Sequence, residues 1–248
     1  DKKKIVLMWT PRDHPWQSHM YQHECRLLAA CLNQSPGINA IISPDPEWPK
    51  DPDVLKDAAA IVYYSRQAGD IVLSPAHRAD FERMMHSGVG FTAIHWATKA
   101  QDSTLLDPYI AVLGGAFHEQ PGWGLKTDTR PLIQVDPGHP ICRGWKPFDL
   151  HEEWYLGTKF HDRAKPLIKV DIDGKDQVLA WVFERDGGGR SFGTTLGHFH
   201  DNFSIDSFRK ALVNGILWTA RVEIPERGAP VELGDDLLKL HAEDDHRN

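Results

Sequence analysis

The sequence has few cysteines, and this shortage excludes several classes of protein. Its 248 residues include three cysteines. Cys25 and Cys31 lie six positions apart on one expected helix, and Cys142 stands alone in the sequence. Neither a disulfide framework nor a Cys-x-x-Cys redox or zinc motif is therefore expected. We expect three free and mostly buried thiols.

Long hydrophobic runs and an excess of basic residues are also missing. No stretch approaches the roughly 18 consecutive apolar residues of a membrane-spanning helix. The formal net charge is −7, whereas nucleic acids and anionic membranes are recognised through basic patches. We therefore expect a small-molecule partner, with no nucleic acid and no membrane, and leave a homo-oligomer open. The start at Asp1 leaves open a periplasmic or secreted protein whose signal peptide was removed, or a cytoplasmic one.

The first hundred residues alternate between strands and helices. Apolar runs predict buried strands over 4–9, 38–43, 59–65 and 89–95. Helices are predicted over 19–32 and 74–88, with a short helical piece near Val54. This alternation predicts an α/β fold whose parallel sheet is covered by helices on both faces.

The rest of the chain predicts an extended β insertion and a return to the sheet. The region from about 114 to 165 is rich in Gly, Pro and Trp and contains short alternating runs. Hairpin turns are expected at Asp173-Gly174 and over 186–189, and Ser204 is expected to cap a last helix. We predict one domain over residues 1–231, followed by a loose polar tail over 232–248.

Histidines concentrate where strands are expected to end. His14 and His19 follow the first strand, His95 ends the fourth, and His198 and His200 end the last. Ligands of open α/β sheets bind beyond the carboxyl ends of the strands, so one pocket is expected to gather these imidazoles.

Several segments resemble one known family across nearly the whole chain. They are "RDHPWQSH", "VGFTAIHWAT", "LGGAFHEQPGW", "GHPICRGWKPFDLHEEWY" and "GGGRSFGTTLGHFHDNFSIDSFRKALVNGILWTA". Together they resemble the trehalose-utilisation (ThuA-like) family. The resemblance implies a flavodoxin-like, three-layer fold similar to class I glutamine amidotransferases, with a mostly parallel central sheet. It also implies a role in carbohydrate metabolism.

The turn "AIHWAT" indicates which chemistry to expect. Amidotransferases of this fold carry a nucleophile at the tight turn from strand to helix. Here His95 stands where a glutaminase carries cysteine, so glutamine amidotransferase activity is not expected. His95 is instead a positioned imidazole, suited to general acid–base work or to a metal.

The candidate site residues fall into three groups, with some alternatives. Glu152 competes with Glu153 because it matches the family's usual Asp in "DEWY", and His23 competes with a structural role beside Leu27. His200 is left between site and structure, and Trp123 and Tyr155 between sugar stacking and core packing. The predicted catalytic residues are His95, His198 and Glu153; the predicted substrate-binding residues are His14, Trp123, Tyr155, His200 and Asn202; the predicted metal ligands are His19, His95 and His198.

Two classes of function fit these residues. The first is an isomerase, lyase or hydrolase that acts on a disaccharide, glycoside or keto-sugar by acid–base chemistry. A divalent zinc, manganese or nickel ion bound by imidazoles would suit it, and no nucleotide cofactor is expected. The second is a non-catalytic sugar-binding protein of the same fold, which would not need so many imidazoles.

Overall fold

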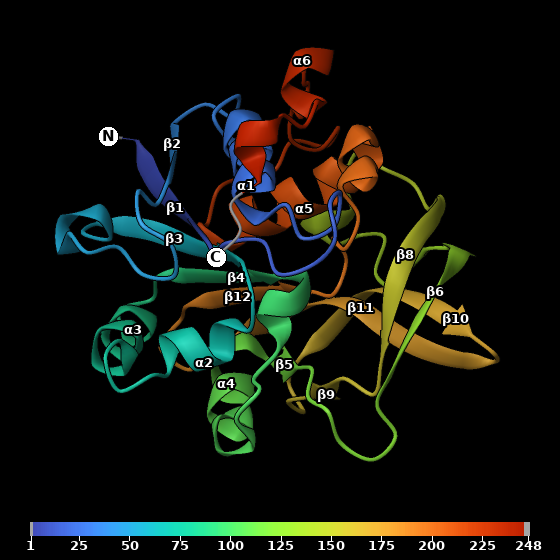
Figure 1. Cartoon of the computed structure of the whole chain (residues 1–248), viewed down its shortest axis with the longest axis horizontal. Helices are drawn as coiled ribbons and strands as arrows, with labels where there is room; N and C mark the ends of the chain where they lie inside the picture. The colour runs from blue at the N-terminus through green and yellow to red at the C-terminus, as the bar shows by residue number, and fades with distance from the viewer. Residues whose placement is uncertain (1, 246–248) are drawn as a thin grey trace.

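A computed structural model describes residues 2–245. At their centre lies one eight-stranded sheet (Figure 1). Five neighbouring strands run parallel, and three antiparallel strands extend the sheet beyond them. The α/β fold class with a mostly parallel sheet is confirmed. The strands lie in the order β2 (Ile38–Ile42), β1 (Lys3–Trp9), β3 (Ala58–Tyr64), β4 (Gly90–Ile94), β12 (Arg190–Thr194), β11 (Lys175–Glu184), β10 (Lys165–Ile172) and β7 (Ile133–Gln134).

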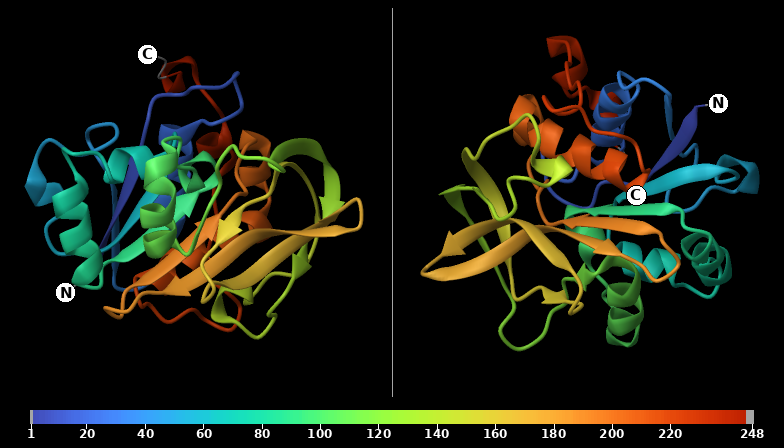
Figure 2. Two further views of the ribbon diagram at one scale, coloured as in Figure 1. Left: turned by 90° about the horizontal axis from the view of Figure 1, so that it is seen from below. Right: turned by 180° about the vertical axis from the view of Figure 1, so that it is seen from behind.

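The parallel strands form where the sequence has continuous apolar runs, because helices cover both of their faces. On β3, Val62 packs into one apolar core and its neighbours Ile61 and Tyr63 into the other. Helices α1 (Tyr21–Leu32) and α5 (Asp206–Thr219) cover one face, and α2 (Ala68–Val72), α3 (Arg78–His86) and α4 (Leu106–Leu113) cover the opposite face (Figures 1 and 2). The helices and strands that the sequence predicts in the first hundred residues lie within a few residues of the observed ones.

The last helix begins one residue later than expected. A short 3-10 turn, η5 (His200–Ser204), precedes α5, and the Ser204 hydroxyl donates to the carbonyl of Asp201. Ile205 occupies the N-cap position and makes no side-chain capping bond. The predicted Ser204 cap is wrong, because the turn uses that hydroxyl before the helix starts.

The predicted β insertion contains strands outside the main sheet. β6 (Gly124–Pro131) pairs antiparallel with β8 (Asp149–Leu156), and β5 (Gly115–Ala116) pairs with β9 (Lys159–Phe160). β6 and β8 stand at one side of the molecule (Figure 1). The hairpin turn between β10 and β11 has Asp173 and Gly174 at φ 53° and 80°, as a two-residue turn of this kind requires.

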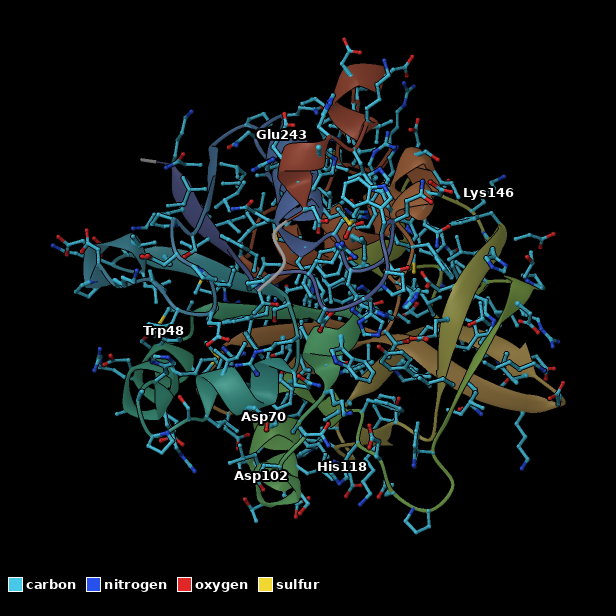
Figure 3. The ribbon with its side chains drawn as sticks, viewed as in Figure 1. Trp48, Asp70, Asp102, His118, Lys146 and Glu243 are labelled. Carbon is cyan, nitrogen blue, oxygen red and sulfur yellow. The ribbon has the colours of Figure 1, made fainter. Side chains whose placement is uncertain are left out.

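The tail lies against α1, unlike the loose end expected from its polar sequence. Asp244 is buried, and its carboxylate lies 2.7 Å from an Arg26 nitrogen and 3.3 Å from Nδ1 of His23. Figure 3 labels Glu243 beside this helix. The ion pairs explain the packing, since a buried carboxylate needs a cation or a donor. Residues 246–248 of the predicted tail lie outside the described residues.

Helix length and composition bear on membrane insertion. Among residues 2–245, no helix is both long enough and apolar enough to cross a membrane.

Candidate active site

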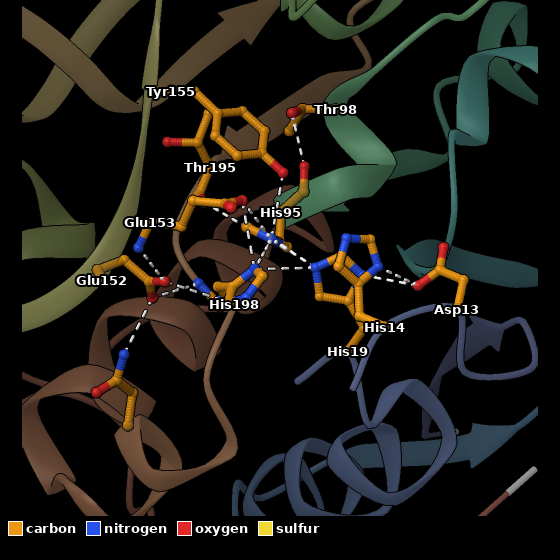
Figure 4. Close-up of polar contacts among 12 residues, drawn as sticks. Asp13, His14, His19, His95, Thr98, Glu152, Glu153, Tyr155, Thr195 and His198 are labelled. Carbon is orange, nitrogen blue, oxygen red and sulfur yellow. Dashed lines mark hydrogen bonds and ion pairs between the residues drawn. The ribbon is translucent and has the colours of Figure 1, made fainter. Parts of the chain in front are cut away.

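Three imidazoles from separate segments meet at the carboxyl edge of the parallel strands (Figure 4). Nε2 of His19 lies 2.9 Å from Nε2 of His95. Nδ1 of His198 lies 3.1 Å from each of these two nitrogens. His19 and His95 are 0% exposed and His198 is 8% exposed. These three nitrogens are close enough to bind a single metal ion. We call these three residues the histidine triad.

His95 occupies a strained turn between β4 and the 3-10 turn η2 (His95–Thr98). Its φ is 56°, a left-handed conformation that non-glycine residues seldom adopt. The Thr98 hydroxyl donates to the carbonyl of His95, at 2.7 Å. Asp70 accepts the backbone N–H groups of Gln101 and Asp102, which fixes the segment that follows (Figure 3). The turn projects the imidazole into the triad, as the sequence predicted.

His19 also has a left-handed backbone, with φ 53°, and two side chains hold its ring. Its Nδ1 lies 2.8 Å from a carboxylate oxygen of Asp13, to which the Tyr21 hydroxyl also donates. Burial raises the pKa of Asp13, but hydrogen bonds from His14 and His19 outweigh burial and keep this pKa well below its ordinary value. Asp13 is therefore an ionised acceptor that orients the His19 ring.

Burial keeps the two innermost imidazoles neutral. It lowers the pKa of His19 to about 4 and the pKa of His95 well below its ordinary value. Neutral imidazoles have a lone pair that can accept a proton or bind a metal.

Strand β8 brings Glu153 and Tyr155 to the triad. An oxygen of Glu153 lies 3.3 Å from Nδ1 of His198 and 3.7 Å from Nε2 of His95. The Tyr155 hydroxyl lies 3.2 Å from Nε2 of His95, and burial raises the pKa of Tyr155, which keeps the hydroxyl protonated. Proton-transfer groups thus approach the triad from the β insertion.

Glu152 points away from the triad and binds the loop that carries His198. Its carboxylate accepts the backbone N–H groups of Gly197, His198 and Glu153, at 2.8–3.1 Å, and the side-chain amide of Asn202. Burial raises the pKa of Glu152 to about 7, although the amide bonds lower it in part. The structure therefore places Glu153 at the triad and gives Glu152 the position of a support.

Aromatic rings line one side of the triad. Trp96 contacts Tyr155 edge-on at 5.8 Å between ring centroids, and Phe117 lies 4.4 Å from Tyr155. Trp123 packs edge-on against Phe117 and is 42% exposed, whereas Tyr155 is fully buried. The His14 ring lies 3.6 Å from that of His19 between centroids, tilted by 36°, and is partly exposed. Trp123 and His14 are thus the more exposed rings of this aromatic group.

The other predicted residues lie apart from the triad. His200 donates from Nε2 to the carbonyl of Leu238 at 2.7 Å, and its Nδ1 faces the buried Glu24. His23 packs edge-on against His200 and faces Asp244. Both histidines lie beneath the C-terminal segment, so their environment matches the structural alternative.

Three neighbours of the triad were missed by sequence reasoning. Asp13, Tyr21 and Trp96 contact triad members but were not singled out. Asp13 and Trp96 stood inside the motifs "RDHPWQSH" and "AIHWAT", where an acid or aromatic ring beside a candidate histidine was the available signal.

The cysteines stay outside this chemistry. Cys25, Cys31 and Cys142 are buried and free. Burial raises the pKa of Cys31 to about 11 and that of Cys142 to about 12, so neither forms a reactive thiolate at neutral pH.

Solved structures of other proteins share this fold. A ThuA-like protein from Parabacteroides merdae has a TM-score of 0.68 and 16% identity, covering 97% of this chain and 100% of that one. A ThuA-like protein from Bacteroides uniformis has a TM-score of 0.67 and 18% identity, covering 92% and 95%. The glutaminase domain of Trypanosoma brucei CTPS with bound acivicin has a TM-score of 0.53 and 9% identity, covering 94% and 100%.

The sequence was also compared with curated proteins and with family models. It matched none of the curated proteins. The model of the ThuA family, described as trehalose utilisation, matches residues 5–219. Since this match spans most of the sequence, the chain belongs to the ThuA, trehalose-utilisation, family.

Proposed function

We propose that the protein is an enzyme of carbohydrate catabolism that moves protons on a disaccharide, glycoside or keto-sugar. The family implies a role related to trehalose utilisation. The observation that carries the proposal is the convergence of His95, His198 and Glu153, whose facing atoms lie 3.1–3.7 Å apart. A general acid or base must lie within hydrogen-bond reach of the proton that it moves, and this spacing allows a proton to pass between neighbours.

The exposure of these groups suggests how they share the work. His95 is fully buried, whereas the side chains of His198 and Glu153 are 11% and 15% exposed. Glu153 and His198 therefore reach a bound hydroxyl or carbonyl directly. His95 supports them from the buried side, where the Tyr155 hydroxyl lies 3.2 Å from its Nε2.

A panel of sugars tests the proposal. Purified protein is incubated with disaccharides, glycosides and their keto derivatives, and products are followed by NMR while binding is followed by thermal shift. We expect turnover of at least one sugar, and Glu153→Gln should lower it roughly 10²–10⁴-fold because amides do not exchange protons at neutral pH. Sugar binding without turnover of any panel member would favour the non-catalytic alternative instead.

The matched control for this experiment is His86→Ala. His86 ends α3 and is exposed, and it precedes the start of β4. It therefore lies at the edge of the sheet opposite the triad. Its replacement should leave turnover unchanged.

Trp123→Ala is expected to weaken sugar binding roughly 2- to 10-fold, since an aromatic stacking contact contributes about 0.5–1.5 kcal/mol. The exposed ring supports little of the core, so unfolding free energy should change by about 0.5 kcal/mol or less. Titration of the sugar identified in the panel measures the first effect, and urea denaturation measures the second. A loss of about 3–5 kcal/mol would show that Trp123 is a core residue.

A further inference from the structure

The histidine triad poses a problem of proton placement. A neutral imidazole carries a proton on one ring nitrogen and a lone pair on the other. Where two ring nitrogens face each other at hydrogen-bond distance, one of them must carry a proton. We assign the protons from the groups that each opposite nitrogen contacts.

The partner of His95 fixes its tautomer. Nδ1 of His95 lies 2.7 Å from the backbone carbonyl oxygen of Thr195, which can only accept. Nδ1 therefore carries the proton and donates it to Thr195. Nε2, the atom that faces the triad, has a lone pair.

The partner of His19 gives the same result. Nδ1 of His19 lies 2.8 Å from a carboxylate oxygen of Asp13, which also accepts from the Tyr21 hydroxyl and so acts as an acceptor here. The Tyr21 hydroxyl lies 2.7 Å from the same Nδ1 and donates its own proton to the carboxylate, so the atom that it turns toward Nδ1 is an oxygen that accepts. Nε2 of His19 therefore also presents a lone pair to the triad.

One proton at His198 does not resolve the conflict. Nδ1 of His198 can donate to one of its two neighbours, both 3.1 Å away, and the Tyr155 hydroxyl, 3.2 Å from Nε2 of His95, is a second donor that approaches from outside the triad. The remaining contact, Nε2 of His19 against Nε2 of His95 at 2.9 Å, then joins two lone pairs. Two such atoms repel each other, unless a cation is shared between them.

The opposite side of the His19 ring provides a comparison within the same residue. Asp13, His14 and His19 also place three potential ligand atoms together. There, donation from both ring Nδ1 atoms to one carboxylate oxygen, each at 2.8 Å, accounts for the short distances. Ordinary hydrogen bonds explain that group, whereas they do not explain the triad.

We propose that His19, His95 and His198 bind one first-row divalent transition metal through Nε2, Nε2 and Nδ1. Two imidazole nitrogens at about 2.1 Å from a metal lie roughly 3.0 Å apart when they are neighbours in an octahedron, and roughly 3.4 Å apart in a tetrahedron. The observed sides of the triad are 2.9, 3.1 and 3.1 Å. This spacing is nearer the octahedral value, so Mn²⁺, Co²⁺ and Ni²⁺ are the first ions to test.

The surroundings of the triad fit such a site. Metal-bound histidines usually donate their other ring nitrogen to a carboxylate or a backbone carbonyl, as His19 does to Asp13 and His95 does to Thr195. His198 and Glu153 are the more exposed members of the group, with side chains 11% and 15% exposed, so a substrate would approach the metal from their side. The inference deepens the proposed function. It rests on that function in one respect, namely that a sugar approaches the metal from the side of Glu153. A bound metal would polarise a sugar carbonyl or hydroxyl there.

Metal titration of untagged protein tests the inference. Protein treated with chelator and dialysed is titrated with MnCl₂, CoCl₂ and NiCl₂ by calorimetry, and the metal retained after desalting is measured by mass spectrometry. We expect one ion per chain and, with Co²⁺, visible absorption bands of imidazole ligation. His19→Asn and His198→Gln should each weaken binding roughly 100-fold or more, while His86→Ala should bind as the wild type does.

Two ligand variants are used so that the test still gives an answer if one of them does not fold. Asparagine tolerates the left-handed backbone of residue 19, and circular dichroism shows which variant is folded. The inference is overturned if the wild-type protein retains none of the three metals, as expected if a shared proton bridges the triad. It is also overturned if a folded ligand variant binds as tightly as the wild type. Because no sugar is present, metal binding without sugar turnover would contradict only the proposed function.

Discussion

His95→Asn is expected to lower sugar turnover by roughly 10²–10⁴-fold, because His198 and Glu153 lose the imidazole that supports them in proton transfer. Nε2 of His95 contacts the other two triad members and Tyr155, so its removal disrupts the centre of the cluster. Asparagine suits the left-handed backbone at this position. We therefore expect a folded variant, destabilised by about 1–3 kcal/mol through the lost bond to Thr195.

The measurement is kcat/KM for the sugar identified in the panel, with His86→Ala as the control. Circular dichroism and urea denaturation establish that the variant is folded. A folded His95→Asn protein that turns over sugar at the wild-type rate would place the active site somewhere other than the turn after β4.

Glu152→Ala is expected to destabilise the protein by about 3–5 kcal/mol. The fully buried carboxylate accepts four N–H groups, and its removal leaves these buried donors without an acceptor. The loop that places His198 depends on two of them, so activity should fall as well. Urea denaturation at neutral pH measures the change.

Comparing Glu152→Gln with Glu152→Ala shows whether the loop needs only a hydrogen-bond acceptor at this position or also its negative charge. Glutamine keeps an acceptor oxygen, so we expect this variant to lose less stability than Glu152→Ala. If Glu152→Ala unfolds within about 1 kcal/mol of the wild type, the carboxylate does not hold the loop and Glu152 has another role.

Much of the fold was accessible from the sequence because burial dictates its pattern. The runs that became β1, β3 and β4 are apolar at nearly every position, as a parallel sheet with two covered faces requires. The motif "AIHWAT" predicted the projecting His95 because a tight turn at a strand end leaves the side chain few directions.

Details that depend on distant contacts were not accessible. The choice between Glu152 and Glu153 depends on amides of the loop around Gly197, some 45 residues away in the chain. His198 and His200 are near neighbours, and the hydrogen bond from His200 to the carbonyl of Leu238 shows that His200 faces the tail. The sequence predicted a loose tail because it does not show that the buried Asp244 carboxylate pairs with Arg26. This partner lies 218 residues earlier in the chain.

Arg12 carries a consequence for how the protein should be handled in the laboratory. Its guanidinium donates to the carbonyl of His14 and lies 2.5 Å from Asp245. A bulky label at Asp245 would therefore sit beside the loop that carries His14 and His19. Lys3, at the start of β1, lies at the opposite edge of the sheet, so labels for binding assays belong near the start of β1.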